Sequence, residues 1–394
     1  MHAIYIGTLC STAYLAVYFA RNILGAVTPQ MISSGYSESY IGSVSSMFFI
    51  FYAVGQLING AIGDKIKARY MISTGLLMAG VTSLVFSHLA SDFANLALVA
   101  YGFTGFFLAM IYGPMTKVVA ENTEPKYATR CSLGYTFASF FGSPCAGLAA
   151  VAFVWKDVFF VSSIILAFMA VICFLVFLLF EKKGIVGYNK YRKQKEQGGS
   201  VAVLLKHDIV RFTLISMITG VVRTTVVFWL PTYLSQYLGF SEDSAAMLFT
   251  VSTFVISFTT FIAIFIYEYL GSNMYRTILV MFSSATVFFA LVYLVKIPFL
   301  NTVFLVLAIM SSNGAATMLW SRYCPSLRDT GMVSAATGFL DFISYMSAAA
   351  SSTFFANAVS VIGWGNLILV WLGFMVAGVA VALPYKKILS RERT

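Results

Sequence analysis

The sequence predicts an all-α membrane protein with twelve transmembrane helices in two pseudo-symmetric six-helix bundles. Three observations predict it: an apolar composition, a regular series of apolar runs, and one polar stretch near the middle of the chain. Of the 394 residues, 59% are hydrophobic and only 10% are charged, whereas soluble domains are about 25% charged. A water-soluble fold could not bury this much apolar surface. Soluble enzymes, nucleic-acid-binding proteins and disordered proteins are therefore excluded.

Twelve apolar runs are long enough to cross a bilayer, which takes about 20 apolar residues in an α-helix. Each run is bounded by charged residues, proline or glycine. In chain order the runs cover residues 3–27, 40–63, 70–90, 94–119, 127–152, 157–180, 208–234, 244–268, 275–295, 300–322, 333–360 and 363–385. The first run has no basic leader and is too long for a signal peptide, so we expect it to be retained as a transmembrane helix.

One longer hydrophilic stretch lies between the sixth and seventh runs. It is rich in lysine and then reads Gln-Gly-Gly-Ser at 197–200, a composition typical of a flexible linker. We therefore expect three parts: an N-terminal six-helix bundle at 1–180, a cytoplasmic linker at 181–207 and a C-terminal six-helix bundle at 208–394. The other connections are short and leave no room for a domain outside the membrane.

Basic residues are distributed unevenly between the loops. Twenty lie in the linker, the C-terminal tail and alternate loops, whereas the opposite loops hold only Lys156 and Lys296. Because loops rich in Lys and Arg stay on the cytoplasmic side, we expect both termini and the linker in the cytoplasm. The net charge of +10 is therefore a topology signal and not a nucleic-acid-binding patch. The chain has no long targeting extension, and we expect a multi-pass protein of a bacterial inner (plasma) membrane.

The two halves of the chain repeat one pattern of landmark residues. Arg21 and Arg223 are each followed eight residues later by a proline, then by a Gly-aromatic-Ser-Glu sequence and an acidic residue. The distance from Arg21 to Asp64 is 43 residues, and that from Arg223 to Glu268 is 45. Parallel six-helix repeats are typical of secondary transporters whose substrate site lies near the bilayer midplane, between the halves.

Apart from charged residues at or near the run ends, three charged residues lie inside apolar runs: Arg21, Arg223 and Asp341. An arginine at mid-bilayer costs about 2.5–3.5 kcal/mol on insertion scales. A structural ion pair with the single acid would account for one arginine at most. We therefore expect both arginines to face a water-filled cavity and to bind an anion, because a guanidinium matches phosphate or carboxylate oxygens two at a time. A phosphate monoester, with a charge of about −1.5 to −2 near neutral pH, suits two guanidinium groups best.

Tyrosines accompany these charges at helical spacing. Tyr14, Tyr18 and Arg21 are four and three residues apart, so they share one face of the first helix. The two phenols would either donate hydrogen bonds to the same anion or form an aromatic stripe in a helix interface. Asp341 and Tyr345 share a face of the eleventh run. Asp341 is a candidate salt-bridge partner for an arginine, a proton site, or a contact for a substrate hydroxyl.

The segment Asn-Gly-Ala-Ile-Gly-Asp-Lys at 59–65 resembles the loop motif between helices two and three of the major facilitator superfamily. Gly60, Asp64, Lys65 and the following Arg69 match its glycine, acidic and basic positions. The resemblance implies a cytoplasmic gate, in which the glycine allows close packing and the acid forms charge pairs across the gate. It also implies the major facilitator fold for the whole chain.

Two further segments resemble the organophosphate:phosphate antiporter family, which contains the glycerol-phosphate and hexose-phosphate transporters. They are Tyr-Phe-Ala-Arg-Asn at 18–22 and Trp-Leu-Pro-Thr-Tyr-Leu at 229–234, after Arg223. Residues 337–345 are similar to the eleventh helix of that family. The resemblance implies that the anion is bound by Arg21 and Arg223 in a pocket lined by Tyr14, Tyr18 and Tyr345.

The chain departs from that family at several pocket positions. Gln56 stands where relatives carry a lysine, Lys117 where they carry an arginine, and Gly220 where some carry a tyrosine. Ala138 or Ser139 stands where the glycerol-phosphate branch carries a histidine. The arginine pair is kept while the surroundings have lost polar groups, so we expect a divergent member.

These residues predict a secondary active transporter of a phosphorylated organic anion in exchange for inorganic phosphate, by alternating access around paired arginines. Proton-coupled symport of an organic carboxylate or sugar acid, nitrate-type exchange, and a transporter-like sugar-phosphate sensor stay open as alternatives. The expected partners are a small anionic substrate, inorganic phosphate and the lipid bilayer, with no nucleic acid. We expect a monomer.

The sequence contains no motif that is typical of an enzyme active site or a metal site. The three histidines (His2, His88 and His207) and the five scattered cysteines lack the spacing of a metal site, and no glycine-rich phosphate loop precedes a soluble helix. We therefore expect no catalytic residue, no metal, no cofactor and no enzymatic activity.

Overall fold

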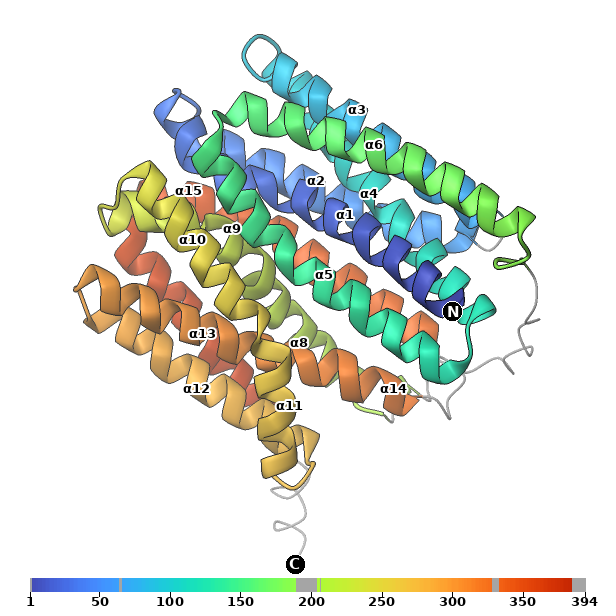
Figure 1. Cartoon of the computed structure of the whole chain (residues 1–394). Coiled ribbons are helices and arrows are strands. Elements are labelled where there is room, and N and C mark those ends of the chain that lie inside the picture. Colours follow the sequence, from blue (N-terminus) through green and yellow to red (C-terminus); the bar gives the residue numbers. More distant parts are fainter. Residues whose placement is uncertain (1, 64–65, 189–203, 206, 328–332, 385–394) are drawn as a thin grey trace, which may run out of the picture. The chain divides into compact units, whose positions relative to one another are not determined.

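The computed structural model describes residues 2–63, 66–188, 204–205, 207–327 and 333–384, and most of these residues are helical (Figure 1). These ranges contain no β-strand. The predicted all-α class is therefore confirmed. Ten helices within the described ranges are long and apolar enough to cross a membrane.

The described residues form two compact units. The first contains the described residues up to 188, together with Phe228–Phe254 and Ser352–Ala356. The second contains the described residues of 204–227, Val255–Ser351 and 357–384. Two short segments of the second half of the chain thus pack within the first unit. The predicted domain boundaries at 180 and 208 stay a prediction.

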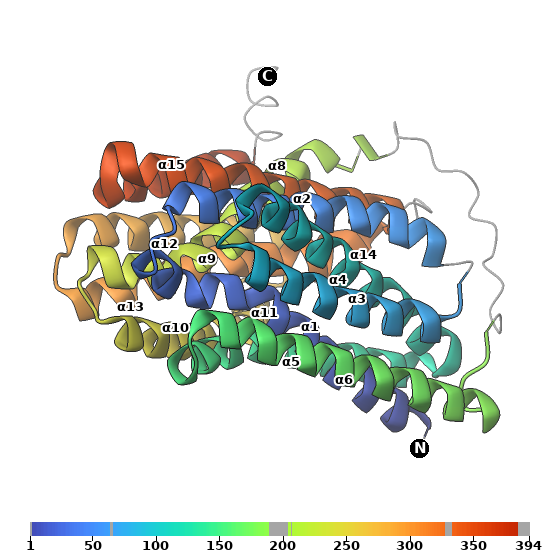
Figure 2. The ribbon, with the colours of Figure 1, turned by 90° about the horizontal axis from the view of Figure 1, so that it is seen from above.

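Six long helices make up most of the first unit. They are α1 (His2–Ser33), α2 (Glu38–Gly63), α3 (Ala68–Leu89), α4 (Ala94–Asn122), α5 (Pro125–Ala152) and α6 (Trp155–Lys182). α1 lies against α5 and α6, and α4 packs on both α2 and α3 (Figures 1 and 2). A Cβ on Gly105 would lie 2.4 Å from the carbonyl oxygen of Phe48. The missing side chain therefore lets α4 approach α2 closely, as small residues do in membrane bundles.

α1 is longer than the predicted run 3–27 because it continues through Pro29 to Ser33. Transmembrane helices tolerate proline where side chains and neighbouring helices satisfy the disturbed backbone. The Thr28 hydroxyl donates to the carbonyl of Leu24 at 2.7 Å. Gln30 donates from Nε2 to the carbonyl of Ala150 in α5 at 2.6 Å. The proline is thus accommodated within a packed helix pair instead of ending the helix.

The seventh to tenth predicted runs correspond to helical segments, and the seventh and tenth contain π-helical turns. The elements are α8 (Ile209–Gly220), η1 (Val221–Val226), α9 (Val227–Thr232), η2 (Tyr233–Tyr237), α10 (Glu242–Ser257), α11 (Thr259–Tyr269), α12 (Met274–Leu294), α13 (Pro298–Met318), η3 (Leu319–Tyr323) and α14 (Cys324–Ser326). The segments η1, η2 and η3 are π-helical. Such turns are rare and frequently occur at functional sites.

The last helix, α15 (Val333–Ala382), covers both the eleventh and the twelfth predicted run. Gly363 interrupts it with φ 72° and ψ 167°, a backbone conformation that glycine adopts almost alone. In α5, the apolar helix Ala138–Ala152 is shorter than a full span. The number of twelve membrane helices therefore stays a prediction.

Side-chain bonds hold α8 and η1 against α15 within the second unit. Arg211 donates to the carbonyl of Val381 from Nε at 2.8 Å, to that of Ala382, and to that of Leu383 at 2.9 Å. These carbonyls lie at the end of α15, where helical partners are lacking. Thr225 in η1 donates to the carbonyl of Ala348 at 3.0 Å. These bonds fix the register in which Arg223 lies beside α15.

Candidate functional site

Arg21 lies among aromatic rings of α1 and α2 in the first unit. Its guanidinium carbon is 5.2 Å from the ring centroid of Tyr18, 5.9 Å from that of Phe49 and 5.2 Å from that of Tyr52. Cation–π attraction acts within about 6 Å of a ring centroid. Phe49 and Tyr52 are three residues apart, so one face of α2 supplies both rings. The arginine predicted from the sequence is therefore supported by aromatic faces from two helices.

A cluster of four tyrosines adjoins this arginine. Tyr14 is 4.9 Å from Tyr18, 5.5 Å from Tyr112 and 5.9 Å from Tyr135, measured between ring centroids. Tyr14 is buried, whereas Tyr18 is partly exposed. The structure thus brings together Tyr14, Tyr18 and Arg21, which the sequence placed on one helix face.

Sequence analysis missed Tyr52, Tyr112 and Tyr135. Spacing within α1 identifies only residues of α1, and these three come from α2, α4 and α5. A signal was present for Tyr52, because it lies one helical turn before Gln56, a position already compared with the family lysine. The chain contains 22 tyrosines, and no comparable signal distinguishes Tyr112 and Tyr135 from the others.

Arg223 lies in η1 of the second unit and also contacts aromatic rings. Its guanidinium carbon is 5.9 Å from the ring centroid of Trp320 and 5.9 Å from that of Tyr345. The atom Nη2 is buried and has no hydrogen-bond partner. Among the described residues, Arg223 forms no ion pair. Tyr345 thus lies beside Arg223, and Trp320 is a further neighbouring ring that was not predicted from the sequence.

Asp341 lies in α15, one helical turn before Tyr345, and is partly exposed. It lies within electrostatic range of Cys324. It does not pair with Arg223, whose side chain has no acidic partner in the described ranges. The other predictions for this carboxylate, a salt bridge with Arg21, a proton site and a contact for a substrate hydroxyl, stay predictions.

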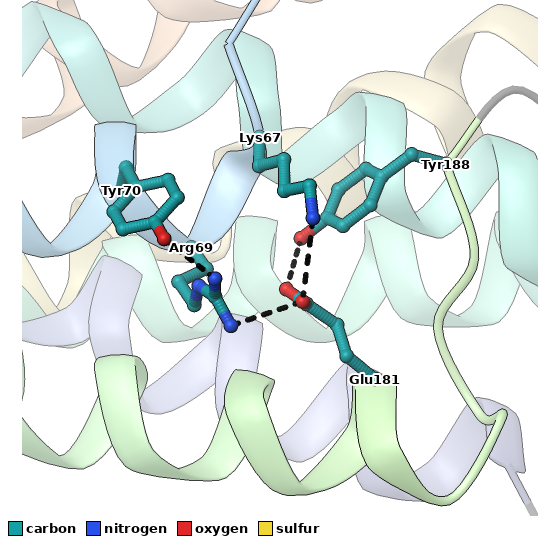
Figure 3. Close-up of polar contacts among 5 residues, drawn as sticks. All are labelled: Lys67, Arg69, Tyr70, Glu181 and Tyr188. Carbon is teal, nitrogen blue, oxygen red and sulfur yellow. Dashed lines mark hydrogen bonds and ion pairs between the residues drawn. The ribbon is translucent and has the colours of Figure 1, made fainter.

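The loop motif between α2 and α3 is described only in part. Gly60 lies in α2 and Arg69 in α3, whereas Asp64 and Lys65 lie outside the described residues. Arg69 pairs from Nη1 with Oε2 of Glu181 at 3.0 Å and donates from Nη2 to the hydroxyl of Tyr70 at 2.7 Å (Figure 3). Sequence analysis missed Glu181 as a partner, although it is the only acidic residue at the end of the sixth run.

The chain after α6 folds back onto this ion pair (Figure 3). Tyr188 donates from its hydroxyl to Oε1 of Glu181 at 2.9 Å, and the backbone N–H of Gly187 donates to Oδ1 of Asn122 at 2.7 Å. Burial, together with the hydrogen bond to Glu181, raises the pKa of the Tyr188 phenol. The neutral phenol is therefore favoured as the donor. The start of the predicted linker is thus bonded to α4 and α6.

The described residues contain no group of three or more His, Cys, Asp or Glu side chains that could hold a metal ion. Arginines inside apolar helices are rare and often mark substrate or ion pathways of membrane proteins.

The sequence profile of the Major Facilitator Superfamily matches residues 10–352. The chain therefore belongs to the major facilitator superfamily, and it is a transporter and not an enzyme. The predicted resemblance to this superfamily is confirmed.

Three curated relatives illustrate where in the superfamily the similarity lies. The glycerol-3-phosphate transporter of Bacillus subtilis is 25% identical over 257 residues, which cover 59% of this chain and 57% of the relative. The membrane sensor protein UhpC of Salmonella typhimurium is 33% identical over 96 residues, 24% of this chain and 22% of the relative. A probable hexose phosphate transport protein of Chlamydia trachomatis is 22% identical over 195 residues, which cover 46% of this chain and 41% of the relative. The chain thus matches at most 57% of the length of these relatives.

Solved structures share the fold across nearly the whole chain. A D-xylose-proton symporter superposes with a TM-score of 0.72 at 13% identity, covering 97% of both chains. A bacterial homologue of the human lysosomal transporter Spinster gives a TM-score of 0.76 at 15% identity, covering 97% of this chain and 96% of that one. At these identities the similarity concerns the fold alone.

Proposed function

We propose that this transporter carries a phosphorylated organic anion, a sugar phosphate or glycerol phosphate, in exchange for inorganic phosphate. The glycerol-phosphate and hexose-phosphate transporters among its relatives support this substrate class. The proposal rests on the surroundings of Arg223. Its buried Nη2 atom has no hydrogen-bond partner, and its charge has no acidic partner among the described residues. A buried donor atom of a charged group that lacks a hydrogen-bond partner is unfavourable. A bound anion would remove that cost.

We propose that Arg21 and Arg223 bind the same anion. Each arginine is supported by ring faces, which attract a cation without accepting its N–H groups. The planar donors of a guanidinium suit phosphate oxygens in a bidentate arrangement. In this proposal Tyr14 and Tyr18 donate hydrogen bonds beside Arg21, and Tyr345 lines the pocket beside Arg223.

The proposed architecture has twelve membrane helices in two six-helix bundles, 1–180 and 208–394, joined by a linker at 181–207. The break at Gly363 supports a division of α15 into two crossings, and the length of α5 supports a further one. We place both termini in the cytoplasm of a bacterium, in its inner membrane, and propose a monomeric carrier. The imbalance of basic residues between loops supports this orientation.

Alternating access around the paired arginines explains why exchange is the expected mode. When the site is empty, closing it brings two positive charges together while water leaves, and their repulsion grows as the effective dielectric falls. A dianion removes that repulsion. The protein would then change sides readily only when it carries phosphate or a phosphate ester.

Counterflow in proteoliposomes tests this mode. Vesicles preloaded with inorganic phosphate or glucose 6-phosphate are expected to take up labelled phosphate, and empty vesicles are not. Uptake that is indifferent to internal phosphate would exclude obligatory exchange. Acidification of the vesicle interior during uptake would instead indicate proton symport, and binding without flux would indicate a sensor.

Lysine substitution tests the two arginines directly. Lysine keeps the charge but loses the planar fork, so Arg21→Lys and Arg223→Lys are each expected to weaken phosphate binding about 10- to 100-fold, the equivalent of one charged hydrogen bond. Isothermal titration of the purified protein measures this. Arg322→Lys is the matched control, because Arg322 is exposed and lies 4.6 Å from the ring centroid of Tyr267. Unchanged affinity in either interior variant would remove that arginine from the site.

A further inference from the structure

Arg223 meets Trp320 at a point where two π-helical turns come together. Arg223 lies in η1 and Trp320 in η3, and both belong to the second unit. The guanidinium carbon is 5.9 Å from the ring centroid of Trp320, within the reach of cation–π attraction. η1 follows α8 and η3 follows α13, and α13 packs on both α8 and η1. Two unusual backbone segments therefore present one cation and one indole to each other.

Both side chains project from π turns. A π turn closes i→i+5 hydrogen bonds and so holds more residues than an α turn. Each extra residue rotates the following side chains by about 100° around the helix axis. Arg223 and Trp320 lie inside these wide turns, at 221–226 and 319–323. The backbone is therefore irregular on both sides of the contact between Arg223 and Trp320.

Trp320 belongs to a partly exposed stripe and not to the core. Asn313, Thr317 and Trp320 are spaced four and three residues apart, which places them on one face of α13 and η3. All three are partly exposed, whereas Trp229 and Trp371 are fully buried. The indole of Trp320 therefore does not fill the core. Core packing does not account for its contact with Arg223.

An aromatic support has a chemical advantage over an acidic one. A carboxylate beside Arg223 would bind the planar N–H donors that an anionic substrate needs. A ring face stabilises the positive charge while leaving those donors free. The buried Nη2 of Arg223, which has no partner, agrees with this arrangement.

We propose that Trp320 is a positioning residue, whose indole holds the Arg223 guanidinium in the plane in which its donors meet a phosphate group. The proposal rests on the proposed function. It adds that Trp320 serves the phosphate, which all substrates and inorganic phosphate share, and not the organic part of the substrate.

Isothermal titration of the full-length protein with inorganic phosphate and with glucose 6-phosphate tests this role. Trp320→Leu is expected to weaken binding of both ligands by the same factor, roughly three- to thirtyfold for the loss of a partly desolvated cation–π contact. Trp320→Phe, which keeps a ring face, is expected to have a smaller effect. Trp364→Leu is the control, because it removes another indole of the same unit, one that packs against Trp371.

A double-mutant cycle with Arg223→Lys separates positioning from a general structural effect. Without the planar guanidinium, Trp320→Leu is expected to weaken phosphate binding little further. The proposal would be overturned if the double variant lost affinity by the product of the two single-variant factors. It would also be overturned if Trp320→Leu weakened the binding of glucose 6-phosphate alone. If the leucine variant does not fold, the same cycle with Trp320→Phe decides.

The two failures can be distinguished. Wild-type protein that binds neither ligand would overturn the proposed function and this inference with it. Phosphate binding that is weakened by Arg223→Lys but unchanged by Trp320→Leu would overturn the inference alone.

Discussion

Glu181 contacts two cations, but only one of them closely. Arg69 is 3.0 Å away with a side chain that is 10% exposed, whereas Lys67 is 4.0 Å away and 53% exposed. A buried partner depends on its counter-charge, and an exposed one is already solvated. The two contacts of Glu181 therefore differ in their value for stability.

Glu181→Gln is expected to lower the melting temperature more than Lys67→Gln, because it removes the closer ion pair with the less exposed partner. Lys67→Gln is the control and is expected to cost less than about 1 kcal/mol. Thermal unfolding of the purified protein in detergent measures both. Equal shifts for the two variants would contradict this assignment.

At the residue scale, residues that share one helix face could be predicted from the sequence. Contacts between side chains of different helices could not. The 4- and 3-residue spacing of Tyr14, Tyr18 and Arg21 was sufficient because one helix face carries all three. The contacts of Arg223 with Trp320 and of Arg69 with Glu181 join distant segments. Periodicity within a run contains no information about such pairs.

At the scale of elements, Gly363 shows how one residue divides a helix. Its φ of 72° and ψ of 167° lie in a region that is strained for every residue with a side chain. The two predicted runs, 333–360 and 363–385, meet at this residue. The apolar pattern located the division because a run boundary was placed beside a glycine.

Gly363→Ala is expected to destabilise the protein by about 1–3 kcal/mol through backbone strain alone, since no atom lies within 4 Å of an added Cβ. Gly365→Ala is the matched control: it is helical and equally open, so it is expected to be neutral or to stabilise by about 0.5–1 kcal/mol. Thermal unfolding compares them. A harmless Gly363→Ala would mean that the helix is continuous.

The π turns could not be predicted from the sequence. Apolar periodicity distinguishes helix from strand, but η1 and η3 have the same apolar character as the α-helices around them. An inserted residue changes the direction of a side chain without changing composition. The predicted runs 208–234 and 300–322 were therefore found, while the π turns that contain Arg223 and Trp320 were not.

At the scale of the whole molecule, the distribution of basic residues predicts the orientation. Alkaline phosphatase fused after residue 92 is expected to be active, because that loop lies on the side with few basic residues. The same enzyme fused after residue 186 is expected to be inactive, and green fluorescent protein at the C-terminus is expected to fluoresce. The opposite pattern would reverse the proposed topology.

The all-α class and the superfamily could be predicted from the sequence because both rest on properties of the whole chain. Composition and run length are averages over many residues, and small errors at run ends leave them unchanged. The grouping into units is different, because it depends on which residues touch. Phe228–Phe254 packs within the first unit, and no pattern along the chain indicates this.

The lack of an acidic partner for Arg223 in the described ranges has an electrical consequence. A charge that crosses the membrane field gains or loses about 2.3 kcal/mol per 100 mV. In the proposed exchanger, an empty site would carry its positive charge through that field, whereas a site loaded with a dianion would not. The membrane potential would then act chiefly on the unloaded protein. It would have almost no effect on the rate of one-for-one phosphate exchange.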